Sequence, residues 1–163
     1  QVVLHELYAT RPTLTTFNHR PTLAEATDGA DAVLLIGDKV VASAPKGEDF
    51  PHQLDLGDAW RRISGLPFVF AAWMTRRGTD LEELPRVLRK QREINRGRIH
   101  GIIDRHATRR GWTRELAELY LCTLLRFDLG QRELKAMSVF WQRCHELGLV
   151  DEVRPLELYS TRG

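Results

Sequence analysis

The chain contains the stretch Ala30-Asp31-Ala32-Val33-Leu34-Leu35-Ile36-Gly37-Asp38, whose apolar run over residues 32–36 ends at a glycine. A continuous apolar run bounded in this way is typical of a strand buried on both faces, as in a parallel sheet between helical layers. In open α/β sheets, ligands bind beyond the carboxyl ends of the strands, where a glycine lets the backbone approach a bound group. From the residues alone, the favoured interpretation is an ordinary turn made by Gly37 and an exposed Asp38.

A capped helix and a second buried strand follow along the chain. The helix signal is Leu54-Asp55-Leu56-Gly57-Asp58-Ala59-Trp60, in which Asp55 is the expected N-cap and Asp58 places a carboxylate in the positive first turn. The strand signal is Gly65-Leu66-Pro67-Phe68-Val69-Phe70-Ala71, whose apolar side chains predict a strand over residues 68–73.

The first part of the chain predicts alternating helices and strands. Apolar residues at helical spacing predict a helix near residues 2–8, and residues 14–17 predict a short strand. Thr22-Leu23-Ala24-Glu25 is a capping box that predicts the start of the next helix. Together with the run at residues 32–36, the order is helix, strand, helix, strand, which indicates an α/β fold.

Only helices are predicted after Trp73. A long helix is expected to reach about Arg110, with Pro85 at its first helical position, where a missing amide donor costs nothing. Gly97 and Gly101 are the points at which this helix is expected to bend or break.

Two further helices complete the prediction. Thr113 precedes a helix over residues 114–125, residues 128–131 precede a helix over residues 132–147, and Gly148 is a stop signal. The side chains expected to face the core are Leu116, Leu119, Tyr120, Thr123 and Leu124 in the first helix and Leu134, Met137, Trp141 and Cys144 in the second.

The composition is that of a packed domain. The chain has 163 residues, of which 42% are hydrophobic, and this suits one domain or the larger part of a two-lobed one rather than a disordered chain. Its longest apolar runs, residues 32–36 and 66–74, are far too short to span a membrane. Cys122 and Cys144 fall at apolar helix positions, which predicts buried free thiols in a protein of the reducing cytoplasm.

The basic charge is concentrated in one segment. The net charge is only +2, yet eleven Lys and Arg residues lie between Arg76 and Arg110 against five Asp and Glu residues. A basic helix can neutralise phosphates, but a charge run is usually a solvated face, and no aromatic stacking platform accompanies this one. We therefore expect no nucleic-acid partner.

Three polar residues have the composition of a metal-ligand set. His100 and Asp104 are one helical turn apart, whereas His106 points away from Asp104 on the same helix. No second ligand motif supports them, so we interpret them as solvated helix-face residues and expect no metal site.

The three quoted stretches, in this order, resemble the chorismate dehydratase family of menaquinone biosynthesis by the futalosine route. That family has a strand close to Ala-Asp-Ala-x-Leu-Leu-Ile-Gly-Asp, an Asp-Leu-Gly-x-x-Trp helix and a Thr-Gly-Leu-Pro-Phe-Val-Phe-Ala strand, and Ser64 replaces the threonine here. Arg126-Phe127-Asp128-Leu129-Gly130 is similar to the family's Arg-Tyr-Asp-Leu-Gly, with Phe127 in place of tyrosine. The resemblance runs from about residue 1 to residue 150.

The resemblance implies a periplasmic-binding-protein-like, two-lobed α/β fold with an all-helical C-terminal part. Residues 1–64 are expected to form most of the second lobe. Residues 65–163 are expected to form a crossover strand that returns to the first lobe, followed by the C-terminal helices. Because the chain opens inside a helix and its motifs lie near the N-terminus, we expect a truncated protein that is inactive alone and lacks most of its first lobe.

The resemblance also implies a reaction. Chorismate would lose water to give 3-[(1-carboxyvinyl)oxy]benzoate in the cytoplasm, in a carbon–oxygen lyase that needs no metal or organic cofactor. Ile36, Gly37 and Asp38 are the substrate-binding residues that the resemblance implies, at one wall of a cleft, and the catalytic residues would lie upstream of Gln1.

Two alternatives share this fold. The first alternative is the sister family of 1,4-dihydroxy-6-naphthoate synthases, which the chain also resembles. In that family the corresponding strand has the sequence Leu-Leu-Ile-His-Glu, and its histidine serves as a base. This chain has Gly37 at that place, which favours the dehydratase. A solute-binding protein of the same fold would bind its ligand without chemistry.

Overall fold

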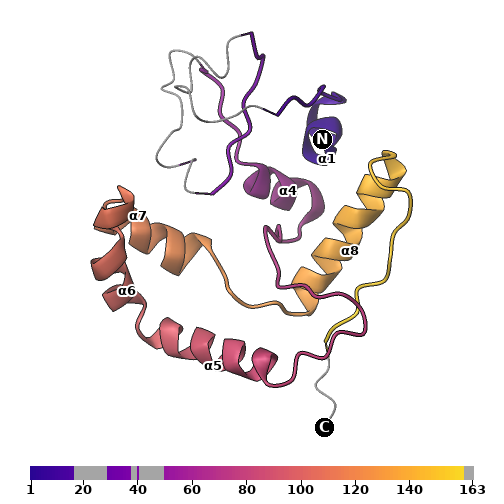
Figure 1. Cartoon of the computed structure of the whole chain (residues 1–163). Helices are drawn as coiled ribbons and strands as arrows, with labels where there is room; N and C mark the ends of the chain where they lie inside the picture. The colour runs from indigo at the N-terminus through magenta and orange to yellow at the C-terminus, as the bar shows by residue number, and fades with distance from the viewer. Residues whose placement is uncertain (17–28, 38–39, 41–49, 160–163) are drawn as a thin grey trace.

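The computed structural model describes residues 1–16, 29–37, 40 and 50–159, and all of its regular elements there are helices. In chain order they are α1 (Val2–Tyr8), α4 (Leu56–Ser64), α5 (Leu84–Gly97), α6 (Ile99–His106), a 3₁₀ turn η1 (Thr108–Arg110), α7 (Arg114–Glu118), a π-helical turn η2 (Leu119–Leu124) and α8 (Gln131–Glu146). Figure 1 shows α1, α4 and α8 together, while α5, α6 and α7 form a separate arm.

The strands predicted over residues 32–36 and 68–73 are not formed within the described part of the chain. A strand requires a neighbouring strand to accept and donate its backbone hydrogen bonds, and no such neighbour lies beside either segment among the described residues. The predicted strand over residues 14–17 ends outside the described residues, and the capping box at residues 22–25 lies wholly outside them. The α/β part of the fold prediction is therefore not confirmed by the part of the chain that the structure describes.

Helix α4 begins as its sequence predicts. The Asp55 carboxylate accepts a hydrogen bond from the Asp58 amide at 2.8 Å, and Asp58 in turn forms an ion pair with Arg61 at 2.8 Å. The helix ends at Gly65, whose φ of 69° is the left-handed conformation that glycine adopts without strain.

Replacing Asp55 with alanine is expected to lower the free energy of unfolding by about 1 kcal/mol, because the Asp58 amide loses its acceptor. Urea denaturation followed by circular dichroism measures this loss. Asp55→Asn keeps a side-chain oxygen at the cap and is the matched control, with a smaller expected loss. An Asp55→Ala midpoint equal to that of the unsubstituted chain would contradict the assigned cap.

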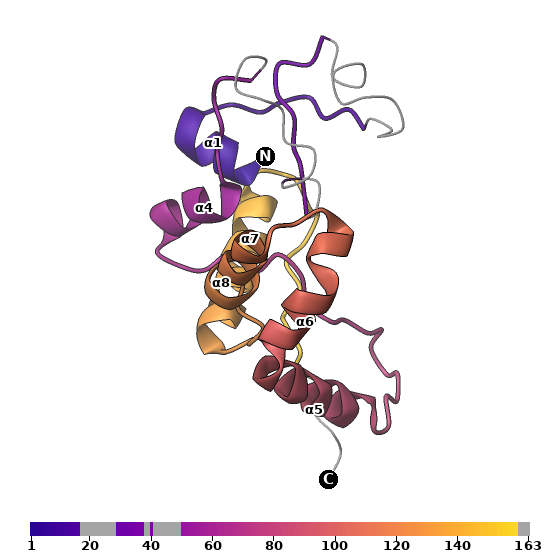
Figure 2. The ribbon, with the colours of Figure 1, turned by 90° about the vertical axis from the view of Figure 1, so that its left-hand side faces the viewer.

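The main core joins α1, α4 and α8. Its buried residues are Val2, Val3, Ala59, Trp60 and Cys144. The Trp60 ring meets the Phe140 ring edge-to-face at 5.3 Å between centroids and the Phe68 ring at 6.5 Å. Such aromatic pairs stabilise a core beyond the area they bury. Figure 2 shows α1 and α4 beside α8.

The predicted core face of α8 is partly wrong. Cys144 is buried as expected, but Trp141 is 41% exposed, and the other fully buried side chain of the helix is Ala136. Cys122 is also exposed, so only one of the two thiols is buried. Burial raises the pKa of the Cys144 thiol, because desolvation disfavours the thiolate.

The long helix predicted after Pro85 is two helices. α5 ends at Gly97, one of the two expected break points, and α6 begins at Ile99. The intervening Arg98 has a φ of −121°, which interrupts the helical backbone. Within the arm, Ile103 of α6 and Ala117 of α7 are buried.

Polar contacts join the helices of the arm to one another and to the segment that follows it. The Arg92 guanidinium donates to the Phe127 carbonyl at 2.6 Å and pairs with the Asp128 carboxylate at 2.7 Å. Arg114 pairs with Asp104 and, at 3.1 Å, with Glu118.

Within the described residues, no helix has both the length and the apolar character that a membrane span requires.

Candidate functional site

The site that the sequence predicts is the end of the apolar run at Ile36, Gly37 and Asp38. Ile36 is 72% exposed, and Gly37 adopts a φ of 70° and accepts a hydrogen bond from the Val40 amide at 3.0 Å. Asp38 lies outside the described residues. The described part of the site is therefore an exposed apolar side chain followed by a tight glycine turn.

The Gly37 turn leaves open space beside the backbone. A Cβ atom added at Gly37 would meet no heavy atom within 4 Å. Glycine is favoured here by its left-handed backbone rather than by crowding, since an L-residue places its Cβ too close to a carbonyl oxygen in this conformation. The arrangement leaves backbone groups accessible to a ligand and supplies no imidazole or other base at this position.

Replacing Gly37 with alanine is expected to lower the free energy of unfolding by about 1 kcal/mol through backbone strain. Thermal denaturation of the two proteins measures the difference. Gly97→Ala is the matched control, because Gly97 also has free space around it but no positive φ, and its stability is not expected to fall. Equal losses in both variants would show that the Gly37 conformation is not the cause.

The remaining sequence motifs contact one another beside the helical core. A Cβ at Gly57 in α4 would lie 2.7 Å from the tip of the Phe70 ring, so the start of α4 and the segment after Gly65 approach closely, and the exposed Phe70 ring would have to move to admit a larger residue. Arg132 in the first turn of α8 donates to the Gly65 carbonyl at 2.9 Å. These contacts link the helix motif, the second apolar run and the residues after Gly130.

Sequence reasoning missed the structural roles of two arginines. Arg132 fixes the turn at Gly65, and Arg92 fixes the backbone at Phe127 and the side chain of Asp128. For Arg132 the sequence offered a signal, because this residue directly follows the Asp128–Gln131 helix start. Nothing in the local sequence, however, indicates which distant carbonyl a long side chain reaches.

The polar set His100, Asp104 and His106 is divided among different contacts. The His100 ring nitrogen lies 3.3 Å from the Glu118 carboxylate, while Asp104 pairs with Arg114. Over residues 1–16, 29–37, 40 and 50–159, no group of three or more metal-ligating side chains is found. The contacts of His100 and Asp104 tie α6 to α7.

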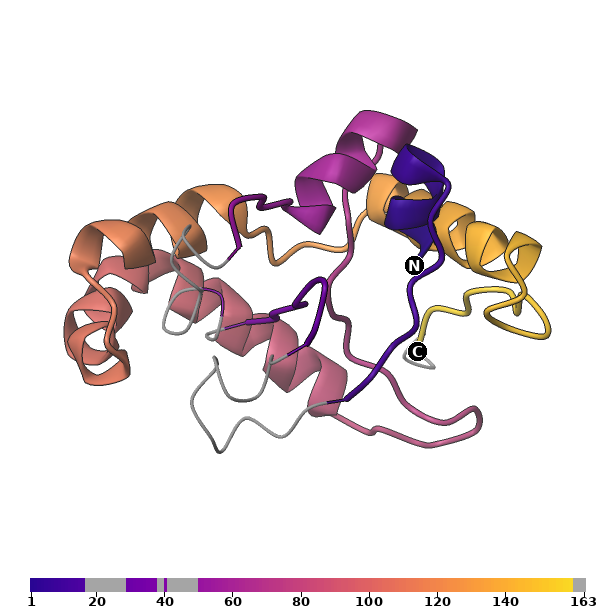
Figure 3. The same ribbon diagram turned by 90° about the horizontal axis from the view of Figure 1, so that it is seen from above.

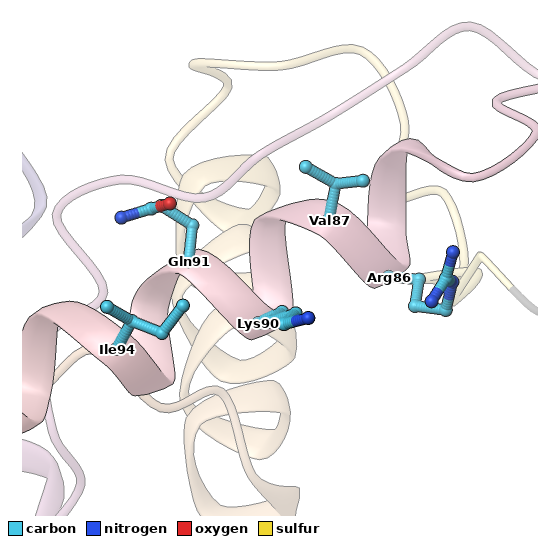
Figure 4. A pocket seen from close by; sticks show the side chains of 5 residues that line it. All are labelled: Arg86, Val87, Lys90, Gln91 and Ile94. Carbon is cyan, nitrogen blue, oxygen red and sulfur yellow. The ribbon is translucent and has the colours of Figure 1, made fainter.

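The basic segment forms one solvent-facing hollow of about 260 Å³ on α5. Figure 4 shows the side chains that line it, which are Arg86, Val87, Lys90, Gln91 and Ile94. All five come from successive turns of a single helix, and no second described element contributes a wall. The hollow therefore brings together cations and apolar groups without an arrangement suited to catalysis.

One exposed carboxylate has a shifted pKa. Hydrogen bonds from its own backbone amide and from the Thr113 side chain hold the pKa of Glu115 below its ordinary value. Thr113 is also the N-cap of α7, where its hydroxyl accepts from the Leu116 amide. The lowered pKa of Glu115 is explained by the hydrogen bonds at the start of α7, so it does not indicate a reaction site.

Comparison with known proteins points to one family. A family model described as menaquinone biosynthesis matches residues 1–146. A chorismate dehydratase from Thermus thermophilus is 31% identical over 125 residues, a match that covers 68% of this chain and 46% of that relative. The match thus spans less than half the length of the relative. No solved structure matches the chain.

Proposed function

Because this chain belongs to the menaquinone biosynthesis family, we propose that it is part of a chorismate dehydratase. The proposed reaction removes water from chorismate and gives 3-[(1-carboxyvinyl)oxy]benzoate. The similarity to a protein named chorismate dehydratase supports this choice of substrate and product.

The glycine turn at Gly37 is the observation that favours chorismate dehydratase over the related 1,4-dihydroxy-6-naphthoate synthase. The sister enzyme, 1,4-dihydroxy-6-naphthoate synthase, is expected to need a histidine base at this place, and a glycine supplies none. The φ of 70° at Gly37 and the free space around it suit a backbone that approaches a bound carboxylate. We propose Ile36, Gly37 and Asp38 as substrate-binding residues on this basis.

In the proposed reaction the main contribution of the protein is to orient the substrate. Loss of the ring hydroxyl and a ring proton as water creates an aromatic ring, which strongly favours the product. The protein must hold a dicarboxylate in the reactive geometry and exclude competing water. In this proposal the residues near Gly37 form one wall of the binding cleft.

We propose for the complete enzyme a two-lobed α/β fold of the periplasmic-binding-protein kind, located in the cytoplasm. Residues 1–64 would belong to the second lobe, and residues 65–163 would return to the first lobe and end in the helices described above. The contact between the Phe68 and Phe70 rings, at 4.9 Å between centroids, supports an extended backbone in the returning segment, because alternate side chains lie on one face.

The test is product formation by the complete gene product that contains this sequence. Purified protein is incubated with chorismate, and 3-[(1-carboxyvinyl)oxy]benzoate is measured by liquid chromatography. We expect turnover by the complete protein, none by the chain of 163 residues alone, and reduced turnover by Gly37→His, because an imidazole would fill the open turn.

Two results would overturn the proposal. Binding of chorismate by the complete protein without any product would favour a solute-binding protein of the same fold. Formation of 1,4-dihydroxy-6-naphthoate from its cyclic precursor would favour the sister enzyme.

A further inference from the structure

Gly65 lies at the end of α4, where the boundary between the two proposed lobes falls. Hinges between lobes are usually a few loop or element-terminal residues that absorb changes in φ and ψ, and glycine does so with the least strain. Gly65 is the left-handed C-cap of α4, and a Cβ there would meet no heavy atom of the described residues within 4 Å. By position and backbone freedom alone, Gly65 would be assigned as a hinge.

The hydrogen bonds around Gly65 argue against a hinge. The Ser64 hydroxyl donates to the Trp60 carbonyl at 2.8 Å and accepts from the Leu66 amide at 3.1 Å. The Gly65 amide donates to the Arg61 carbonyl at 2.9 Å. One hydroxyl therefore bridges the last turn of α4 and the first residue after the glycine.

Arg132 holds the same turn from another helix. Its guanidinium donates to the Gly65 carbonyl at 2.9 Å. Arg132 lies in the first turn of α8, where the helix dipole disfavours a cation, but its charge reaches the C-terminal end of α4, where the dipole favours one. This placement indicates that the arginine stabilises the end of α4 rather than the start of α8.

The chain beyond the turn is anchored as well. The centroid of the Phe68 ring lies 6.5 Å from that of Trp60 and 5.3 Å from that of Phe140. The two partner rings belong to α4 and α8, the same helices that hold Gly65. Turning the chain about Gly65 would separate these rings and break the hydrogen bonds of the turn.

We propose that Ser64 and Arg132 form a clamp that makes Gly65 a rigid junction, so that closure of the lobes bends the chain elsewhere. This inference rests on the proposed function for the two-lobed fold and for the boundary at Gly65. In the complete enzyme the clamp fixes the direction in which residues 66–74 leave α4. Ser64 and Arg132 are therefore positioning residues, which act through the backbone rather than on the substrate.

Hydrogen exchange of the Leu66 amide, measured residue by residue in the complete gene product, tests the clamp. We expect this amide to be protected, and its exchange not to rise when 3-[(1-carboxyvinyl)oxy]benzoate is added. Ser64→Ala removes the acceptor and is expected to speed the exchange about fivefold, as the loss of one hydrogen bond predicts. Ser64→Thr keeps the hydroxyl and is expected to retain the protection.

A second pair of variants tests the contribution of α8. Arg132→Met keeps an aliphatic side chain but removes the donor to the Gly65 carbonyl. It is expected to speed exchange at Leu66 about threefold, less than Ser64→Ala, because an exposed contact contributes less. Lys135→Met is the matched control, since it removes an exposed cation from the same helix one turn further on. It is expected to leave the exchange unchanged.

Turnover of chorismate separates positioning from stability. At a temperature where every variant is folded, Ser64→Ala and Arg132→Met are expected to lower kcat/KM about tenfold, because a small misplacement disturbs the reactive geometry. Ser64→Thr and Lys135→Met are expected to keep the kcat/KM of the unsubstituted protein.

Three outcomes would overturn the clamp. The first is a Leu66 amide that exchanges as fast in the unsubstituted protein as in Ser64→Ala. The second is exchange that rises when 3-[(1-carboxyvinyl)oxy]benzoate binds, which would make Gly65 a hinge. The third is an equal effect of Arg132→Met and Lys135→Met. Absence of product from the unsubstituted protein would instead refute the proposed function, and the exchange rates would still decide for or against the clamp.

Discussion

Replacing Trp60 with alanine is expected to lower the free energy of unfolding by about 3–5 kcal/mol, the largest effect of any single substitution proposed for this chain. Trp60 of α4 is 1% exposed and belongs to the core cluster shared with α1 and α8, where its ring contacts both Phe68 and Phe140. Removing the indole takes away the hydrophobic contacts and leaves a cavity that the three helices can only partly fill. Urea denaturation followed by circular dichroism at 222 nm, the usual helix signal, measures the change.

Two further variants separate the cavity from other causes. Trp73→Ala removes the same side chain from a position that is 89% exposed, and its stability is expected to change little. Trp60→Phe keeps an aromatic ring and removes the indole Nε1, which is buried without a hydrogen-bond partner among the described residues. It is therefore expected to cost less than Trp60→Ala. Equal losses for Trp60→Ala and Trp73→Ala would contradict the assigned core.

Replacing Ile103 with alanine is expected to cost about 2–5 kcal/mol in the arm formed by α5, α6 and α7. Ile103 is 1% exposed and lies on the helix that contacts α7 and η1. Ile94→Ala is the matched control, because the same side chain on α5 is 38% exposed. Hydrogen exchange of the α6 and α7 amides locates the loss, which is expected within the arm. A loss confined to α1, α4 and α8 would contradict the separate cluster.

The sequence predicted the helix starts well because a helix start depends on a few neighbouring residues. The hydroxyl of Thr113 and the carboxylate of Asp55 accept hydrogen bonds from amides three residues later, as their positions predict. Pro85 lies in the first turn of α5, and Gly97 ends it. Each of these features is determined within one turn of the backbone. The family prediction, which rests on short motifs read in order along the chain, is also confirmed.

The predictions that failed depend on distant partners. Trp141 has the right helical spacing for a core stripe, but the neighbours of α8 contact the adjacent face. Cys122 fits an apolar position and yet lies on an exposed turn of η2. The apolar runs predict strands that need a sheet beside them, and local sequence does not supply the sheet. The binding role proposed for Gly37 was not tested in this way and stays a prediction.

The hydrogen bond between Arg132 and the Gly65 carbonyl joins two points 67 residues apart along the chain. Figure 3 shows the chain leaving α4, passing through α5, α6 and α7, and returning to the start of α8. In topological terms the arm is a closed loop whose entrance and exit are adjacent. The entropic cost of closing such a loop grows only slowly with the number of residues in it, so the length of the arm has little effect on the stability of the three-helix core.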